Sequence, residues 1–168
     1  RYYEQEPFPD DPESQEKYWF DGEFVLRRNL HRFRHTYFGG DAFPQIFLNL
    51  GASGHAGYFK NVRYHLDNRT VWFDPIISNW ETDQLKFEPI GSLYSKTLNL
   101  VRYLVQESRQ RYFVSMPDIS GNMDALAHLR GSENLLMDLI LAKENVKEAL
   151  ERIQKAWLKT NREVEKIV

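Results

Sequence analysis

The chain has 168 residues, of which 22 are Lys or Arg and 24 are Asp or Glu, so its formal net charge is −2 at pH 7. This length suits one domain with a sizeable core, and the balanced charge argues against the basic surface that a nucleic-acid partner needs. The absence of cysteine excludes disulfides, thiolate metal sites and cysteine nucleophiles in this chain. No apolar run approaches the roughly 20 residues that span a bilayer, so we expect no membrane segment and a cytoplasmic location.

The N-terminal part of the chain changes character at residue 21. Residues 1–20 contain three prolines and many acids, and we interpret them as an irregular entry segment ahead of a domain at 21–168. A helix is predicted from Asp21, an expected N-cap, to the glycine pair at 39–40. Its apolar face repeats at helical spacing, with Leu26, Leu30, Phe33 and Tyr37.

The middle of the chain alternates extended and helical patterns. FPQIFLNL, residues 43–50, predicts a buried strand, and GASGHAGYFKN after it predicts one or two helical turns. Residues 62–78 predict extended segments with a hairpin over Asp67-Asn68. A long helix is expected at 93–109, opened by Ser92 or Ser95.

The C-terminal part begins with RYFVSM, which predicts a second buried strand. A polar loop, MPDISGNMDALAHLRG at 116–131, follows this strand, and then come a short helix over LLMDLILA and a final helix at 144–167. Strands that alternate with long helices favour parallel βα units, but two confident strands make a poor sheet. Either the extended region supplies further strands or the chain is part of a larger barrel, and we favour the barrel.

Candidate site residues follow the two predicted strands, where working residues of parallel α/β folds lie. Asn49 and His55 follow the first strand. Asp118, Ser120 and Asp124, together with an asparagine at 122, follow the second strand. Both loops contain glycine, which lets backbone approach a ligand. The alternative is that Asp118 and Asp124 only cap the turn and the next helix.

The histidines give no metal motif. His31 and His35 are four apart on a predicted helix, a spacing that can bind a metal, but the glutamate of a zinc-protease motif is missing. The arginines around them favour a solvated basic face. The sequence also has no P-loop and no G-x-G-x-x-G.

Three stretches resemble the uroporphyrinogen decarboxylase superfamily, and more closely its uncharacterised bacterial branch. They are GGDAFPQIFLNLG, TVWFDPIISNW and RYFVSMPDISGNMDALAHLRG. The superfamily includes corrinoid-dependent methyltransferases and is similar to cobalamin-independent methionine synthases. The resemblance runs from about Trp19 to the C-terminus and implies the N-terminal portion of a (β/α)₈ TIM barrel, with about three βα units.

The resemblance also implies a site. Asn49 aligns with the aspartate that grips the pyrrole nitrogens in the decarboxylases, and with Asp118 it would be catalytic. His55, Trp72, Ser120 and Asp124 would bind a small-molecule substrate. The amide of Asn49 carries no charge, the M-R-Q-A-G-R motif has no counterpart, and the G-G-P-x-T loop reads MPDISG here. These departures argue against uroporphyrinogen decarboxylation itself.

The expected function is therefore an enzyme of decarboxylase or methyltransferase type, acting on a methyl group or a carboxylated cyclic substrate. No cofactor is evident in the chain, and the resemblance would place zinc or a corrinoid partner in the complete enzyme. The remaining barrel half or a homo-oligomer would complete the fold. The alternative is a ligand-binding or interaction module whose aromatic residues, 14% of the chain, recognise a sugar or a partner surface.

Overall fold

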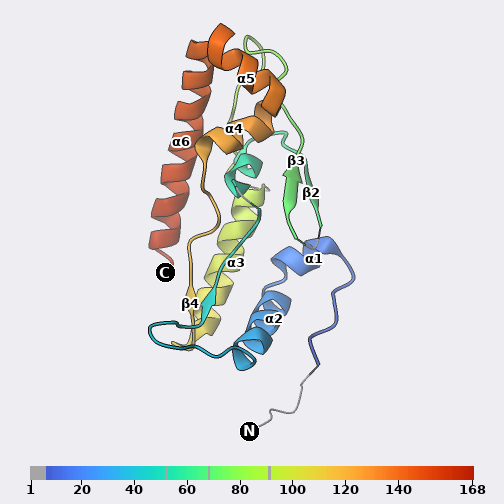
Figure 1. Cartoon of the computed structure of the whole chain (residues 1–168), viewed down its shortest axis with the longest axis vertical. Coiled ribbons are helices and arrows are strands. Elements are labelled where there is room, and N and C mark those ends of the chain that lie inside the picture. The colour runs from blue at the N-terminus through green and yellow to red at the C-terminus, as the bar shows by residue number, and fades with distance from the viewer. Residues whose placement is uncertain (1–6, 52, 68, 91) are drawn as a thin grey trace.

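The computed structural model describes residues 7–51, 53–67, 69–90 and 92–168. Most of the regular structure in these ranges is helical (Figure 1). The α-helices are α1 (Gln15–Phe20), α2 (Gly22–Arg34), α3 (Leu93–Ser108), α4 (Asn122–Arg130), α5 (Ser132–Leu141) and α6 (Lys143–Glu165). A short 3₁₀ helix, η1, spans Gly54–Tyr58.

The strands form two separate pairs. They are β1 (Gln45–Ile46), β2 (Tyr64–Leu66), β3 (Val71–Phe73) and β4 (Phe113–Val114). β1 pairs with β4 in parallel, whereas β2 and β3 form an antiparallel hairpin. The parallel contact continues past β1, because Ser115 N donates to Ile46 O at 3.0 Å and Asp118 N donates to Leu48 O at 3.0 Å.

The expected α/β fold, an N-terminal portion of a TIM barrel with about three βα units, is wrong. The described residues contain one parallel pair of two-residue strands, and the extended region closes on itself as the β2–β3 hairpin instead of adding a third parallel strand. An apolar run of β-forming residues indicates extended backbone, but it does not determine how many neighbours pair with it. In FPQIFLNL only Gln45 and Ile46 enter a ladder, while Phe43 and Phe47 are exposed.

The core lies between the helices. α6 packs against α3, α4 and α5, and α3 also contacts η1 and β4. Figure 1 shows α6 and α3 running side by side, with α4 and α5 across one end. The most deeply buried apolar side chains of these helices are Leu93, Val101, Leu104, Leu126, Leu129, Ile153 and Val164. The apolar faces predicted for 93–109 and 144–167 are therefore largely covered.

The N-terminal expectations are correct in part. Within the entry segment, which we expected to be irregular, α1 forms with Ser14 as its N-cap, and residues 1–6 lie outside the described ranges. Asp21 caps α2 as expected, since its Oδ1 accepts from Phe24 N at 2.9 Å. α2 ends at Arg34 rather than at the glycine pair, and Tyr37 is 93% exposed instead of continuing the apolar face.

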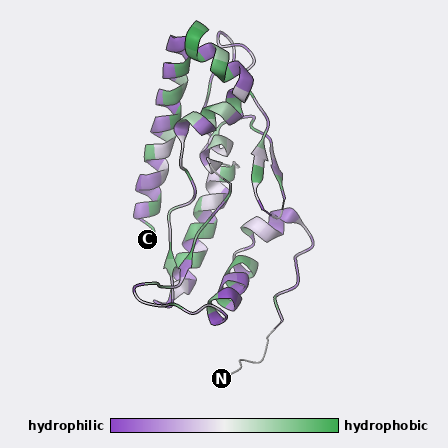
Figure 2. Cartoon of the chain, viewed as in Figure 1, coloured by the Kyte–Doolittle hydropathy of each residue, from purple (hydrophilic) through white to green (hydrophobic). Residues whose placement is uncertain are grey.

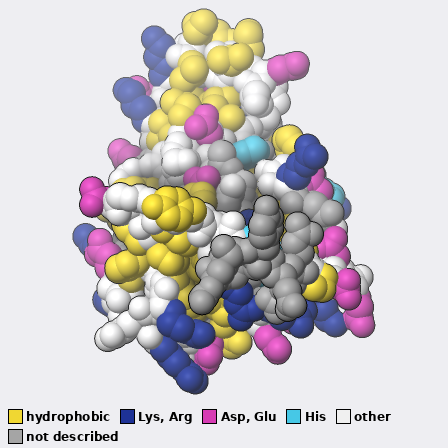
Figure 3. All heavy atoms as spheres, turned by 60° about the horizontal axis from the view of Figure 1, so that its bottom comes forward, with side chains coloured by type: hydrophobic (Ala, Val, Ile, Leu, Met, Phe, Trp, Pro, Cys, Tyr) yellow, Lys and Arg dark blue, Asp and Glu magenta, His cyan; other side chains and the backbone are white. Residues whose placement is uncertain are grey.

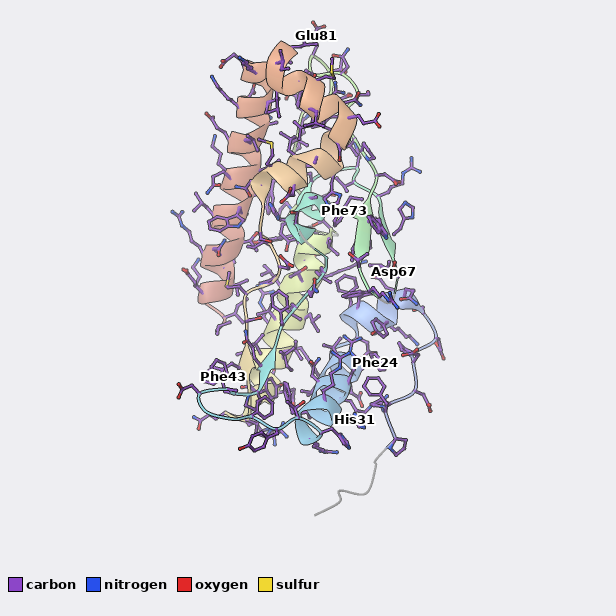
Figure 4. The ribbon with its side chains drawn as sticks, in the orientation of Figure 1. Phe24, His31, Phe43, Asp67, Phe73 and Glu81 are labelled. Atoms are coloured by element: carbon purple, nitrogen blue, oxygen red, sulfur yellow. The ribbon has the colours of Figure 1, made fainter. Side chains whose placement is uncertain are left out.

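The predicted hairpin is confirmed, although Asn68 lies outside the described ranges. Asp67 Oδ1 accepts from Arg69 N at 2.6 Å and from Thr70 N at 2.7 Å, so the aspartate closes the turn with backbone bonds. Trp19 Nε1 donates to Asp67 O at 2.6 Å. Figure 4 shows Asp67 at the end of the hairpin that faces α1, where this bond joins the two.

Candidate functional site

The loops after β1 and β4 meet directly. Gly54 N donates to Asp118 O at 3.2 Å, and Ser53 Oγ donates to Ser120 O at 2.7 Å and to Gly121 O at 3.2 Å. Ser53 is fully buried, so these bonds satisfy a hydroxyl that has no access to water. Because β1 and β4 are parallel neighbours, their following loops emerge at the same edge, as the sequence predicts.

The first loop needs an unusual backbone. Gly51 has φ +77, and a Cβ at this position would lie 3.2 Å from Val71 N and 3.3 Å from Val71 O. A side chain at residue 51 would therefore meet the backbone of β3 as well as an unfavourable φ. Ser53 also has a positive φ, of 64. The loop is held in this shape from both sides, by β3 and by the second loop.

His55 and Asn122 form the innermost contact between the loops. His55 is fully buried at the start of η1, and its Nε2 lies 3.0 Å from Oδ1 of Asn122, the first residue of α4. Asn122 Nδ2 donates to Gln154 Oε1 on α6. This second bond sets the amide orientation, so Asn122 Oδ1 accepts and His55 Nε2 carries the proton.

His55 is consequently a neutral, structural imidazole. Burial lowers its pKa from 6.5 to about 4, an effect that the hydrogen bond to Asn122 and the nearby Asp118 oppose only in part. Its Nδ1 is buried without a hydrogen-bond partner within the described part of the chain. The structure thus places His55 beneath the loops rather than on the surface where a substrate would bind.

Asp118 and Ser120 lie at the surface of the second loop. Asp118 is half-buried, and its Oδ1 accepts from Ser120 Oγ at 2.9 Å. This contact orients the carboxylate and leaves Oδ2 for an external group. The backbone of Asp118 is fixed at both ends, because its N–H binds Leu48 O and its carbonyl binds Gly54 N.

Asn49 lies on the adjoining part of the first loop. Its side chain is exposed, and Oδ1 accepts from Gly51 N at 3.0 Å, which leaves the amide Nδ2 as the remaining donor. Asn49 also lines a pocket of about 160 Å³ with Arg28 and Arg32 of α2. The backbone bond from Asp118 to Leu48 makes Asn49 a near neighbour of Asp118 in the fold.

Asp124 and Trp72 have different surroundings from Asp118, Ser120 and Asn49. The Asp124 carboxylate folds back on Gly121, which has φ +74, and a Cβ on Gly121 would lie 2.1 Å from Asp124 Oδ2. A carboxylate at the start of α4 stabilises the helix terminus, which is the capping alternative. Trp72 is 58% exposed on β3, on the opposite face from Val71 and Phe73, which are buried.

Two partners of the site were missed in the sequence because they come from α6. Gln154 holds Asn122, and Trp157 Nε1 donates to Ile119 O at 2.7 Å. These residues are three apart, so they share one helix face. The only local sign of these contacts in the sequence is a polar Gln near a Trp on the otherwise apolar face of α6. α4 itself was also missed, since we interpreted 116–131 as one loop.

The described residues offer no site for zinc. No group of three or more His, Cys, Asp or Glu side chains in the described ranges lies close enough together to hold a metal ion. His31 and His35 have ring centroids 4.3 Å apart, and His35 Nδ1 binds His31 O at 2.8 Å. The donor set that the resemblance implies for zinc is therefore not formed by these residues, and no step below depends on a metal.

None of the helices within the described ranges is long and apolar enough to cross a membrane. Comparisons with protein-family models, with curated proteins and with solved structures found no match.

Proposed function

We propose that the chain carries the substrate site of an enzyme of decarboxylase or methyltransferase type, related in kind to the uroporphyrinogen decarboxylase superfamily. Its substrate is a small molecule with a transferable methyl group or a carboxylated ring. The site is the surface formed by residues 47–51 and 53 of the first loop and residues 115–121 of the second. Asp118 and Asn49 contact the reacting part of the substrate, and Ser120 orients Asp118.

The observation that carries this proposal is the direct bonding of the two loops. Binding and catalytic residues are commonly presented by loops that a rigid scaffold holds in position. Here Ser53 and His55 are both fully buried and both bond to the second loop. Their bonds hold Asp118 and Asn49 in a constant relation to each other.

The chemistry available at the site is that of one carboxylate beside one amide. Asp118 Oδ2 can accept a proton or bind a cationic group, and Asn49 Nδ2 can donate to a carbonyl or carboxylate oxygen. His55 cannot take the role of a general base, because it is buried and its pKa is about 4. This leaves Asp118 as the acid–base group of the site.

Calorimetric titration with a panel of methyl donors and of cyclic carboxylates, tetrapyrrole carboxylates included, tests the proposal. We expect one compound class to bind the unaltered chain and Asp118→Asn to weaken its binding by about tenfold or more, since a bond to a charged group is lost. Asp41→Asn is the matched control, because Asp41 is exposed and precedes β1 instead of following it. Equal affinity of Asp118→Asn and the unaltered chain would contradict the proposal.

A second candidate function, attachment to a partner surface, is favoured by α5. Its exposed apolar side chains are Leu136, Met137, Leu139, Ile140 and Leu141. Figure 2 shows hydrophobic residues on this helix, at the end of the molecule. Exposed apolar patches on soluble domains commonly mark interaction sites. A platform of exposed aromatic rings is less favoured, since Trp80 is half-buried and its Nε1 donates to Asp138 Oδ2 at 3.0 Å.

Sedimentation analysis of Ile140→Lys tests whether the partner of α5 is a second copy of the chain. If α5 mediates self-association, the unaltered chain forms a dimer or larger species and the variant is monomeric. If both proteins sediment as monomers, self-association through α5 is contradicted.

A further inference from the structure

A small pocket with a basic lining lies between α2 and the segment that follows β1. Its volume is about 160 Å³, and the side chains that give it its character are Arg28, Asn29, Arg32 and Asn49. Apolar walls come from Trp19 and Leu48, among others. A bound water occupies about 30 Å³, so the pocket has room for a few waters or for one oxyanion group.

The described part of the lining carries positive charge. Arg28 and Arg32 are one turn apart on α2, and among the described residues no Asp or Glu lines the pocket. Within the described ranges, no salt bridge to a carboxylate includes either arginine. Asp11, in the entry segment, is the acid that acts on Arg28 electrostatically. The side chains of the pocket thus carry a local excess of positive charge.

Arg28 is held in place with a donor left over. Its guanidinium lies 4.2 Å from the centroid of the Tyr18 ring and 5.5 Å from that of Phe24. Stacking of this kind fixes the plane of the guanidinium group. Arg28 Nε is buried without a hydrogen-bond partner in the part of the chain that the structure describes. A buried N–H of a charged group costs free energy unless an acceptor meets it.

Burial lowers the pKa of Arg28 from its ordinary value, Tyr18 and Asp11 oppose this effect, and the neighbouring Arg32 adds to it. A bound anion would favour the charged form and so act against this lowering. Asn49 adds a neutral donor, Nδ2, because its Oδ1 is already bonded to Gly51 N. The group that these donors match is therefore an acceptor with negative charge and several oxygens.

We propose that this pocket binds an oxyanion, carried as a phosphate or a carboxylate group on a small molecule. Arg28 and Arg32 supply the charge, and the planar fork of arginine matches such oxygens. A cation is disfavoured by the two arginines, and a purely apolar ligand would leave their charge without a partner. Figure 3 looks onto this end of the molecule and shows Lys and Arg side chains gathered beside hydrophobic ones.

Calorimetric titrations of the whole chain with sodium phosphate and with sodium acetate, at constant ionic strength, test the proposal. We expect at least one of them to bind, and the tighter one identifies which oxyanion the pocket prefers. Arg28→Gln should weaken binding by about tenfold or more, as expected for the loss of a charged donor. Arg32→Gln should weaken it also, and because Arg32 is exposed this variant is expected to fold even if Arg28→Gln does not.

Arg27→Gln is the matched control, since Arg27 is exposed on the same helix and does not line this pocket. It removes the same charge from an exposed side chain outside the pocket and should leave the affinity within about twofold, because salt screens exposed charges. Equal weakening by Arg27→Gln and Arg32→Gln, or no binding of either anion, would overturn the proposal. Asp118→Asn should not weaken phosphate or acetate binding, so this proposal and the proposed function can fail separately.

Discussion

Asn122 Oδ1 lies 3.0 Å from His55 Nε2, which joins the first residue of α4 to the start of η1. The two residues are separated by 67 positions in the chain. Since Asn122 also donates to Gln154 of α6, one amide connects the loop after β1, the loop after β4 and the C-terminal helix.

We expect the free energy of unfolding to decrease as the pH falls, because of His55. In the folded chain burial lowers the pKa of His55 to about 4, whereas the unfolded value is near 6.5. The unfolded state therefore binds more protons between about pH 6.5 and pH 4, and stability is lost as pH falls through this window. This difference in pKa between the folded and unfolded states corresponds to about 3 kcal/mol of unfolding free energy.

Chemical denaturation at pH 7 and pH 4 measures this contribution. In His55→Gln the loss of unfolding free energy between the two pH values should be smaller by about 3 kcal/mol than in the unaltered chain. His65→Gln is the control, because His65 is exposed and pairs with Asp74 at the surface. An unchanged pH dependence in His55→Gln would show that His55 is not the buried neutral group described here.

Removal of the Asn122 amide should destabilise the fold. Asn122→Ala leaves the buried His55 Nε2 without its acceptor, which costs about 1–3 kcal/mol. Asn99→Ala, which removes an exposed contact to Arg102, should change the unfolding free energy by less than about 0.5 kcal/mol. The comparison uses urea denaturation at pH 7, and similar effects of the two substitutions would contradict the account of Asn122.

Among the salt bridges, the pair of Arg130 and Asp138 should contribute most to the free energy of unfolding. Arg130 Nε donates to Asp138 Oδ2 at 2.6 Å, and the two side chains are only 12% and 11% exposed. Arg130 also donates to Ile77 O at 3.0 Å and Ser78 O at 2.9 Å, so it fixes the segment after β3 onto α4 and α5.

Asp138→Ala should lower the unfolding free energy by about 3–5 kcal/mol, because it leaves a buried guanidinium unpaired. Glu144→Ala breaks the exposed pair with Lys147 and should cost less than about 1 kcal/mol. Thermal and urea denaturation of both variants give the comparison. A small effect of Asp138→Ala would mean that water replaces the carboxylate at Arg130.

Local signals in the sequence identified much of the secondary structure. Asp21 caps α2 as predicted, because capping depends on a few neighbouring residues. Ser92 precedes α3, but its hydroxyl donates to Glu88 O instead of capping the helix. The hairpin was found from alternation and from the turn at Asp67. The prediction of a barrel was wrong, because the number of strands that pair side by side is decided by contacts between distant segments. Here β2 and β3 pair with each other.

The candidate site was found only in part for the same reason. Asn49, Asp118 and Ser120 could be recognised as polar residues after a strand, and parallel pairing brings their loops together. The burial of His55 and the arrival of Gln154 from α6 depend on helix packing that no local pattern contains. Trp72 was placed in the site by resemblance, and the alternation of β3 turns it to the exposed face.

The most direct test of the central claim, that the two loops form one ligand site, is an amide NMR titration with the compound that binds best in the panel. The account predicts that the amides of residues 49–51, 53–55, 116 and 118–122 shift together, with a single affinity, and that Asp118→Asn weakens both sets equally. Shifts confined to one loop, or to α5, would contradict it.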